Sequence, residues 1–149
     1  MQFSPDLAQA IVDLWKWRTT RLQVGEWCDE TDPELGGDRV QWWRLTKPCA
    51  YTVGHDFAVC PGRGKRQIAR RVPRLITGYL GGIEEAGCVH DTELATEAER
   101  KERYAEREGF RTWYALMAKW DHLYGEHPRK YNPVWVIDFE LVKESASGG

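Results

Sequence analysis

The sequence predicts an α+β fold in which helices flank a small curved sheet or β-barrel. Segments rich in β-branched and aromatic residues alternate irregularly with segments of helical periodicity, and no internal repeat is visible. The 149 residues, of which 42% are hydrophobic and 30% charged, suit one domain whose core needs no metal or disulfide. We therefore expect a single domain over residues 1–143 and a disordered polar tail over 144–149.

The first expected element is a helix that begins at Pro5. Ser4 is a suitable N-cap, and Pro5 fits the first helical position because its missing N–H would have no partner there. Apolar residues then recur at helical spacing over 7–12, and we expect the helix to end at 13–15. Residues 16–22 are rich in β-branched and aromatic side chains, which predicts a short strand.

Turn formers dominate the next part of the chain. Residues 25–38 are acidic and contain several glycines and aspartates, which predicts a loop. Residues 40–45, which carry two tryptophans, are expected to form a single helical turn. A strand interrupted by Gly54 is expected over 51–60, and a turn over 61–64.

The second half alternates a strand with two helices. Residues 67–79 predict a strand, with a bulge or an edge position at Pro73 because proline cannot donate to the ladder. Residues 91–107 are strong helix formers and almost wholly polar, so we expect a solvated helix. Gly109 ends it, and 110–124 predict a further helix with one apolar stripe.

The clearest strand pattern is VWVIDFELV, residues 134–142. Its side chains alternate between the two faces of a sheet, so one face carries only apolar residues. We expect the four members of that face to be buried: Trp135, Ile137, Phe139 and Leu141.

The charge pattern excludes some partners and leaves others open. A net charge of -2 argues against a general high-affinity DNA-binding coat. The run from 62 to 74 nevertheless holds only basic ionisable residues: Arg63, Lys65, Arg66, Arg70, Arg71 and Arg74. This run is either a solvated hairpin turn or a basic loop that touches phosphate; the P-loop spacing G-x-x-x-x-G-K-[ST] is absent.

Metal, membrane and secretion signals are lacking in the sequence. The cysteines show no C-x-x-C spacing and no histidine at ligand distance, so we expect no metal and no cofactor. The four histidines share no spacing with an acid or a serine and are expected at the surface. No 18-residue apolar run and no secretory signal occur, so we expect a cytoplasmic monomer with reduced thiols.

The segment KWRTTR, residues 16–21, places Lys16, Thr19 and Arg21 close together after the first helix. It is either a solvated edge strand or a polar site for a nucleotide or a modified base. Glu108 lies at the junction of the two later helices, where a side chain can point inward. By itself this carboxylate suggests no more than an ion pair, for example with Lys16.

The pattern LWKWRTTR at 14–21 resembles the G-x-K-x-x-[TE]-x-R signature of ASCH domains, which have a PUA-like fold. Further segments occur in the order such domains show: VGHDFAV, PGRGKRQIAR, EREGF, a helix with Trp120, and PVWVIDFELV. The resemblance covers roughly residues 2–142 and implies a PUA-like curved sheet or barrel. One departure is Leu14, which stands where the signature has glycine and is expected to narrow or reshape the pocket.

The resemblance implies a chemistry as well as a fold. Some small ASCH proteins are amidohydrolases that remove the acetyl group of N(4)-acetylcytidine without a metal. Their catalytic lysine, threonine and glutamate correspond to Lys16, Thr19 and Glu108 here. In amide hydrolysis Thr19 would attack the carbonyl and Lys16 would accept its proton, while Glu108 would pass a proton to the leaving amine.

The remaining expectations concern substrate binding and the alternatives. Arg21 and Trp17 are expected to contact substrate, and Arg63, Lys65 and Arg66 to lie at the rim of the same cleft. The alternative is a non-catalytic module that binds RNA or a modified base through the same cleft, with a tryptophan stacked on a base. A protein-interaction module, suggested only by the polar helix, is the third interpretation.

Overall fold

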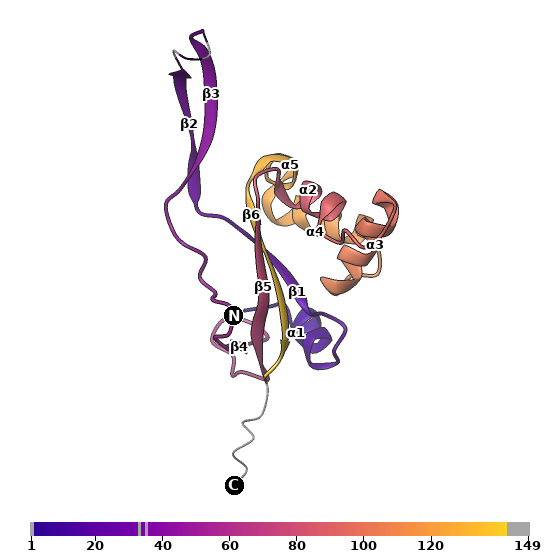
Figure 1. The fold of residues 1–149 in the computed structure, drawn as a ribbon. Helices are drawn as coiled ribbons and strands as arrows, with labels where there is room; N and C mark the ends of the chain where they lie inside the picture. The colour runs from indigo at the N-terminus through magenta and orange to yellow at the C-terminus, as the bar shows by residue number, and fades with distance from the viewer. Residues whose placement is uncertain (1, 33, 35, 143–149) are drawn as a thin grey trace.

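The computed structural model, which describes residues 2–32, 34 and 36–142, confirms an α+β fold with a curved antiparallel sheet and flanking helices (Figure 1). The sheet order is β1-β6-β5-β4. Its strands are β1 (Arg18–Leu22), β6 (Val134–Leu141), β5 (Ala69–Tyr79) and β4 (Phe57–Val59). Strand β1 therefore lies at one edge of the sheet and pairs only with β6 in it.

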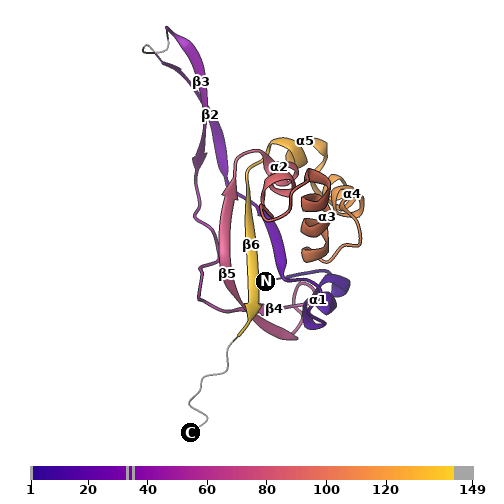
Figure 2. The same ribbon diagram turned by 45° about the vertical axis from the view of Figure 1, so that its right-hand side comes forward.

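Helices cover both faces of this sheet. The first is α1 (Pro5–Val12), which Ser4 caps by accepting a 3.4 Å hydrogen bond from the Leu7 N–H, as the sequence predicts. The other four are α2 (Gly82–Val89), α3 (Glu97–Arg107), α4 (Trp113–Tyr124) and α5 (Glu126–Tyr131). These four gather on one side of β5 and β6, whereas α1 lies near the far end of the sheet (Figure 2).

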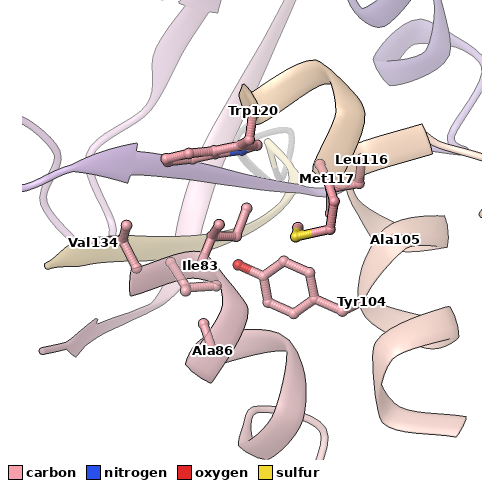
Figure 3. Close-up of a cluster of buried hydrophobic side chains, with 9 residues drawn as sticks. Ile83, Ala86, Tyr104, Ala105, Leu116, Met117, Trp120 and Val134 are labelled. Atoms are coloured by element: carbon pink, nitrogen blue, oxygen red, sulfur yellow. The ribbon is translucent and has the colours of Figure 1, made fainter. Parts of the chain in front are cut away.

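Two hydrophobic clusters fill the space between the sheet and the helices. Figure 3 shows the cluster beneath α2, α3 and α4, where Tyr104 and Ile83 lie close to Val134 of β6. The second cluster joins Phe3 and α1 to the opposite face of β6, at Ile137 and Phe139. Both faces of β6 are thus buried, which explains its nearly continuous apolar sequence.

The expectation for β6 holds for part of the strand. Ile137 and Phe139 are 0% and 2% exposed, and Trp135 is half-buried. Leu141 is 55% exposed, so its predicted burial is wrong; it lies at the last position of the strand, where the helices no longer cover the sheet. The opposite face, predicted to be the less apolar one, is buried as well because α2 to α4 pack on it.

A second, two-stranded sheet projects away from the body (Figures 1 and 2). It consists of β2 (Gly25–Asp32) and β3 (Asp38–Leu45), and we call it the hairpin arm. The predicted loop over 25–38 and the predicted helical turn over 40–45 are both wrong. Cross-strand pairs such as Trp27 opposite Trp43 stabilise strands that local composition does not indicate.

The other elements agree with the sequence to different degrees. The turn over 61–64 is confirmed, and β5 has its predicted irregularity between Pro73 and Leu75. Only 57–59 of the predicted strand over 51–60 form one. The helix predicted over 91–107 begins at Glu97, and α2 was not predicted at all. The predicted tail, 144–149, lies outside the described residues.

Candidate active site at the edge of the sheet

Lys16 lies where the end of α1 meets the junction between α3 and α4. It follows the end of α1, and its neighbour Trp17 donates a backbone hydrogen bond to the Arg107 carbonyl at 3.0 Å. The junction between α3 and α4 therefore lies directly against Lys16. Gly109, with φ +92°, ends α3 there, and a Cβ at this position would come within 3.2 Å of the Lys16 Cβ. Glycine thus allows the close approach of the two segments.

The close approach brings the Lys16 ammonium onto Glu108. Its Nζ donates to the Glu108 carbonyl at 2.8 Å and to the Glu108 carboxylate Oε2 at 3.3 Å, and a third hydrogen bond goes to the Arg18 carbonyl at 2.5 Å. Lys16 and Glu108 are 2% and 4% exposed. The sequence-based expectation that these two residues meet is therefore met by the geometry, although 92 positions separate them.

Opposing effects act on the pKa of the Lys16 amine. Burial lowers the pKa of its amine below the ordinary value, and the charges of Arg21 and Arg18 act in the same direction. The Glu108 carboxylate counteracts this decrease. Three acceptors surround the amine, and a lysine can donate three hydrogen bonds only as the ammonium. In this arrangement Lys16 donates protons and cannot accept one.

A threonine that the sequence analysis did not select completes the cluster. The Thr20 hydroxyl donates to Glu108 Oε1, the carboxylate oxygen that Lys16 leaves free, and it also hydrogen-bonds the Tyr104 hydroxyl. Burial raises the pKa of Tyr104 well above its usual range, so the phenol stays protonated. Period-2 alternation along KWRTTR, which places 16, 18 and 20 on one side of an extended chain, was the available signal for Thr20.

A cavity of about 220 Å³ opens beside this cluster. Lys16, Thr19, Thr20 and Glu108 contribute to its polar wall. The rest of its lining includes seven apolar or aromatic residues: Phe3, Leu7, Phe110, Leu116, Trp120, Leu123 and Tyr124. A flat ring of the size of a pyrimidine fits such a cavity, with polar groups concentrated at one wall.

Thr19 lies in the cavity wall, but its position differs from that of Thr20. It is 4% exposed, and among the described residues no side chain hydrogen-bonds its hydroxyl. The three residues that the resemblance selects, Lys16, Thr19 and Glu108, thus share one cavity. Within the described part of the chain, however, only Lys16 and Glu108 are bonded to each other.

The expected substrate-binding residues are spread over several places. Arg21 lines the cavity. Trp17 is not among the residues that line it; its ring lies between the guanidinium groups of Arg107, at 4.2 Å, and Arg18, at 5.5 Å, measured from the ring centroid. Trp17 lines a second cavity, which Lys16 also lines, so its role in substrate binding stays a prediction.

The basic turn is also separate from the cavity wall. Arg63, Lys65 and Arg66 are exposed and are not among the residues that line the cavity. The segment just before them is close to it, since Phe3 donates a backbone hydrogen bond to the Cys60 carbonyl at 2.9 Å. The predicted location of the basic turn at the rim stays a prediction.

Arg18 of β1 is the centre of a buried ionic cluster. Arg18, which is 0% exposed, donates two hydrogen bonds to Asp138 at 2.5 and 3.1 Å and two to Asp91 at 3.0 and 3.2 Å. His90 hydrogen-bonds Asp138 at 3.4 Å and the Tyr79 hydroxyl at 2.7 Å. The surface position expected for His90 is wrong, because its side chain is only 5% exposed. This cluster fixes β1 against β6 and thereby positions the cavity wall.

Leu14 lies outside the cavity and has an unusual backbone conformation. Its φ of +67° is in the left-handed region, and its side chain is 61% exposed. Leu14 is not among the residues that line the cavity beside Glu108, but it lines a second cavity with Lys16 and Trp17. The expectation that Leu14 narrows or reshapes the ligand pocket stays a prediction. A glycine would fit this position for its backbone freedom.

Two further searches concern only the part of the chain that the structure describes. No group of three or more His, Cys, Asp and Glu side chains is arranged to hold a metal ion there. None of the helices there combines the length and apolarity that crossing a bilayer requires.

Comparison with known proteins does not identify a relative. No protein-family model, no curated protein and no solved structure matches the chain.

Proposed function

We propose that the protein is a metal-independent hydrolase that removes an acyl group from the exocyclic amine of a cytidine-like base, as the ASCH resemblance implies. The observation that supports this most is the buried series Lys16–Glu108–Thr20 at the polar wall of the cavity. It pairs a hydroxyl nucleophile with a carboxylate base, and a cation orients the base. This is the arrangement expected of an activated nucleophile.

The proton acceptor and the nucleophile that we propose differ from those that the resemblance implies. Lys16 donates three hydrogen bonds, so Glu108 rather than Lys16 is the proton acceptor. Thr20 is the hydroxyl that donates to Glu108, so we assign the nucleophile to Thr20. Thr19 also lines the cavity, and its hydroxyl has no side-chain partner among the described residues, so we propose that it donates to the oxyanion that forms on the carbonyl oxygen.

The proposed reaction has two half-reactions. The Thr20 oxygen forms a bond to the acyl carbon while its proton moves to Glu108, and the C–N bond then breaks as Glu108 returns that proton to the amine. In the second half-reaction Glu108 removes a proton from water, which attacks the acyl-threonine ester. The proton returns to the Thr20 oxygen, and the carboxylic acid leaves.

The direct test is turnover of N(4)-acetylcytidine, followed by chromatographic separation of cytidine and acetate. We expect wild-type turnover and a loss of about 10²–10⁴-fold in Glu108→Gln, since the base is removed. Thr20→Val and Thr19→Val form a matched pair, because valine keeps the β-branched shape without the hydroxyl. Thr20→Val is expected to lose most activity, and Thr19→Val to lose less.

Two outcomes would change the proposal in different ways. If Thr19→Val is inactive and Thr20→Val active, the reaction stands but the nucleophile is Thr19. If wild-type protein binds cytidine and acetylcytidine equally well and hydrolyses neither the nucleoside nor acetylated RNA, the hydrolase proposal is wrong. The basic turn with exposed Arg63, Lys65 and Arg66 then favours the alternative, an RNA-binding or modified-base-binding module.

A further inference from the structure

The charges in the cavity wall do not balance. The described ionisable residues that line it with a fixed charge are Lys16, Arg21, Glu108 and Lys119. Lys16 and Glu108 neutralise each other in a salt bridge of 3.3 Å. Two cations, Arg21 and Lys119, therefore face the cavity without a carboxylate, in a chain whose net charge is -2.

Arg21 has most of its hydrogen-bonding capacity unused. A guanidinium offers five N–H donors, and here Nη2 donates to the Gln2 carbonyl at 3.2 Å. The Nε atom is buried and has no hydrogen-bond partner among the described residues, which is a costly arrangement for a charged group. The guanidinium carbon lies 5.2 Å from the centre of the Phe3 ring, so the ring fixes the plane of the group beside the cavity.

The second cation without a carboxylate partner in the cavity lining is Lys119. It lies on α4, next to Trp120, and is half-buried. Among the described residues no carboxylate forms an ion pair with it. It adds a flexible point charge to the lining of the cavity that also contains Arg21.

Two other partly buried arginines, Arg129 and Arg107, form ion pairs with carboxylates. Arg129 contacts Glu84, Asp121 and Glu126. Arg107 contacts Asp91 and Glu93. Arg71 and Arg100 form no ion pair within the described residues, but both donate to backbone carbonyls. Arg21 differs from them because its Nε is buried and has no hydrogen-bond partner among those residues.

We infer that Arg21 and Lys119 form a subsite for an anionic group of the ligand, and that the ligand is a cytidine-like nucleoside monophosphate. A phosphate accepts the paired donors of a guanidinium and the point charge of an ammonium together. A carboxylate carried on the acyl group has the same recognition chemistry. The inference rests on the proposed function for the base, but the subsite itself rests on the charges in the cavity.

Equilibrium binding separates the two sources of the anion. We expect the full chain to bind cytidine 5′-monophosphate about tenfold or more tightly than cytidine, by isothermal titration calorimetry at low salt. The second comparison is N(4)-succinylcytidine against N(4)-acetylcytidine, measured in Glu108→Gln so that turnover does not interfere. A preference for the succinyl compound alone would place the anion on the acyl group and overturn the monophosphate assignment.

Matched variants test the two residues. Arg21→Gln and Lys119→Gln are each expected to reduce the preference for the monophosphate several-fold, and the double variant to abolish it. Lys47→Gln removes an exposed cation that does not line the cavity and is expected to leave the preference unchanged. Thermal unfolding checks each variant, and Lys119→Gln covers the case in which Arg21→Gln fails to fold.

The results distinguish this inference from the proposed function. Equal affinity for cytidine and its monophosphate, no detectable binding of either, or a preference that Lys47→Gln reduces as much as Arg21→Gln, would overturn the subsite. A monophosphate preference that depends on Arg21 and Lys119, in a protein without hydrolase activity, would retain the subsite and overturn the proposed reaction.

Discussion

The central sheet and the hairpin arm hold their ion pairs in opposite environments. Arg18 and Asp138 join β1 to β6 with side chains 1% and 3% exposed. Arg44 and Glu26 join β3 to β2 with side chains 55% and 52% exposed. The residue types and strand pairing are similar, so burial is the variable. The comparison indicates that a charge pair determines the fold only where water cannot replace a missing partner.

Aromatic residues differ between the two regions in the same way. Tyr104 and Trp120 are buried in the helix-covered core of the body. In the arm, Trp27 is 46% exposed and meets Trp43 edge-to-face at 5.4 Å. Two strands alone are marginally stable in water. We therefore expect the arm to contribute little to the stability of the body or to the geometry of the cavity.

The largest expected difference comes from removing the arginine of each pair. Arg18→Met leaves Asp91 and Asp138 buried without their main cation, and we expect a loss of about 3–5 kcal/mol in the free energy of unfolding. Arg44→Met in the arm is expected to change it by less than about 1 kcal/mol. Urea denaturation of both variants measures the contrast. Equal losses would show that burial is not what separates the two regions.

Acid is expected to weaken the body through Asp138. Burial alone would raise the pKa of this carboxyl, but the hydrogen bonds and charges of His90 and Arg18 lower it to about 2. The unfolded chain, with a pKa near 3.8, binds the proton more readily. Stability from this group is therefore complete above pH 4 and is lost as the pH falls towards 2, by about 2 kcal/mol.

The measurement is the free energy of unfolding between pH 5 and 2. Asp138→Asn removes this titration, so its stability is expected to depend less on pH over that range than the wild-type value does. Glu26→Gln in the arm is the control and is expected to leave the pH dependence as it is. A wild-type profile without the acid decrease, matched by Asp138→Asn, would contradict the expected role of the buried carboxylate.

Two glycines with similar positive φ angles allow a test of the contact between Gly109 and Lys16. Gly109 has φ +92° and Gly125 has φ +90°, but a Cβ would lie 3.2 Å from the Lys16 Cβ at the first and no nearer than 3.9 Å from Pro128 at the second. Alanine at either position costs about 1–2 kcal/mol of backbone strain. Gly109→Ala alone is expected also to displace Lys16 from Glu108 and reduce turnover; comparable turnover in both variants would contradict this.

The same comparison shows what could be predicted from the sequence. The cap at Ser4, the irregularity after Pro73 and the position of Gly109 follow from local chemistry, and all three are found. The strands of the hairpin arm could not be predicted in this way. Their pairing depends on partners across the hairpin, such as Trp27 and Trp43, and not on the composition of either segment.

The candidate site was predictable to a similar extent. The meeting of Lys16 with Glu108 came from the resemblance, because no periodicity links residues so distant in sequence. Thr20 could have been found from alternation along β1, but its bond to Glu108 depends on where α3 ends. Lys119 carries no local signal, because a lysine on an amphipathic helix is ordinarily solvated. Its position is set by the packing of α4 beside the cavity.

The smallest expected effect concerns Leu14, whose side chain is largely exposed while its backbone is in the left-handed region with φ +67°. A non-glycine residue in that conformation costs about 1–2 kcal/mol, part of which the greater freedom of glycine in the unfolded chain offsets. Leu14→Gly is therefore expected to stabilise the protein by up to about 1 kcal/mol, measured by thermal and urea unfolding. Turnover and ligand affinity should not change, because Leu14 does not line the cavity. A variant that gained activity without gaining stability would instead mean that Leu14 obstructs the ligand.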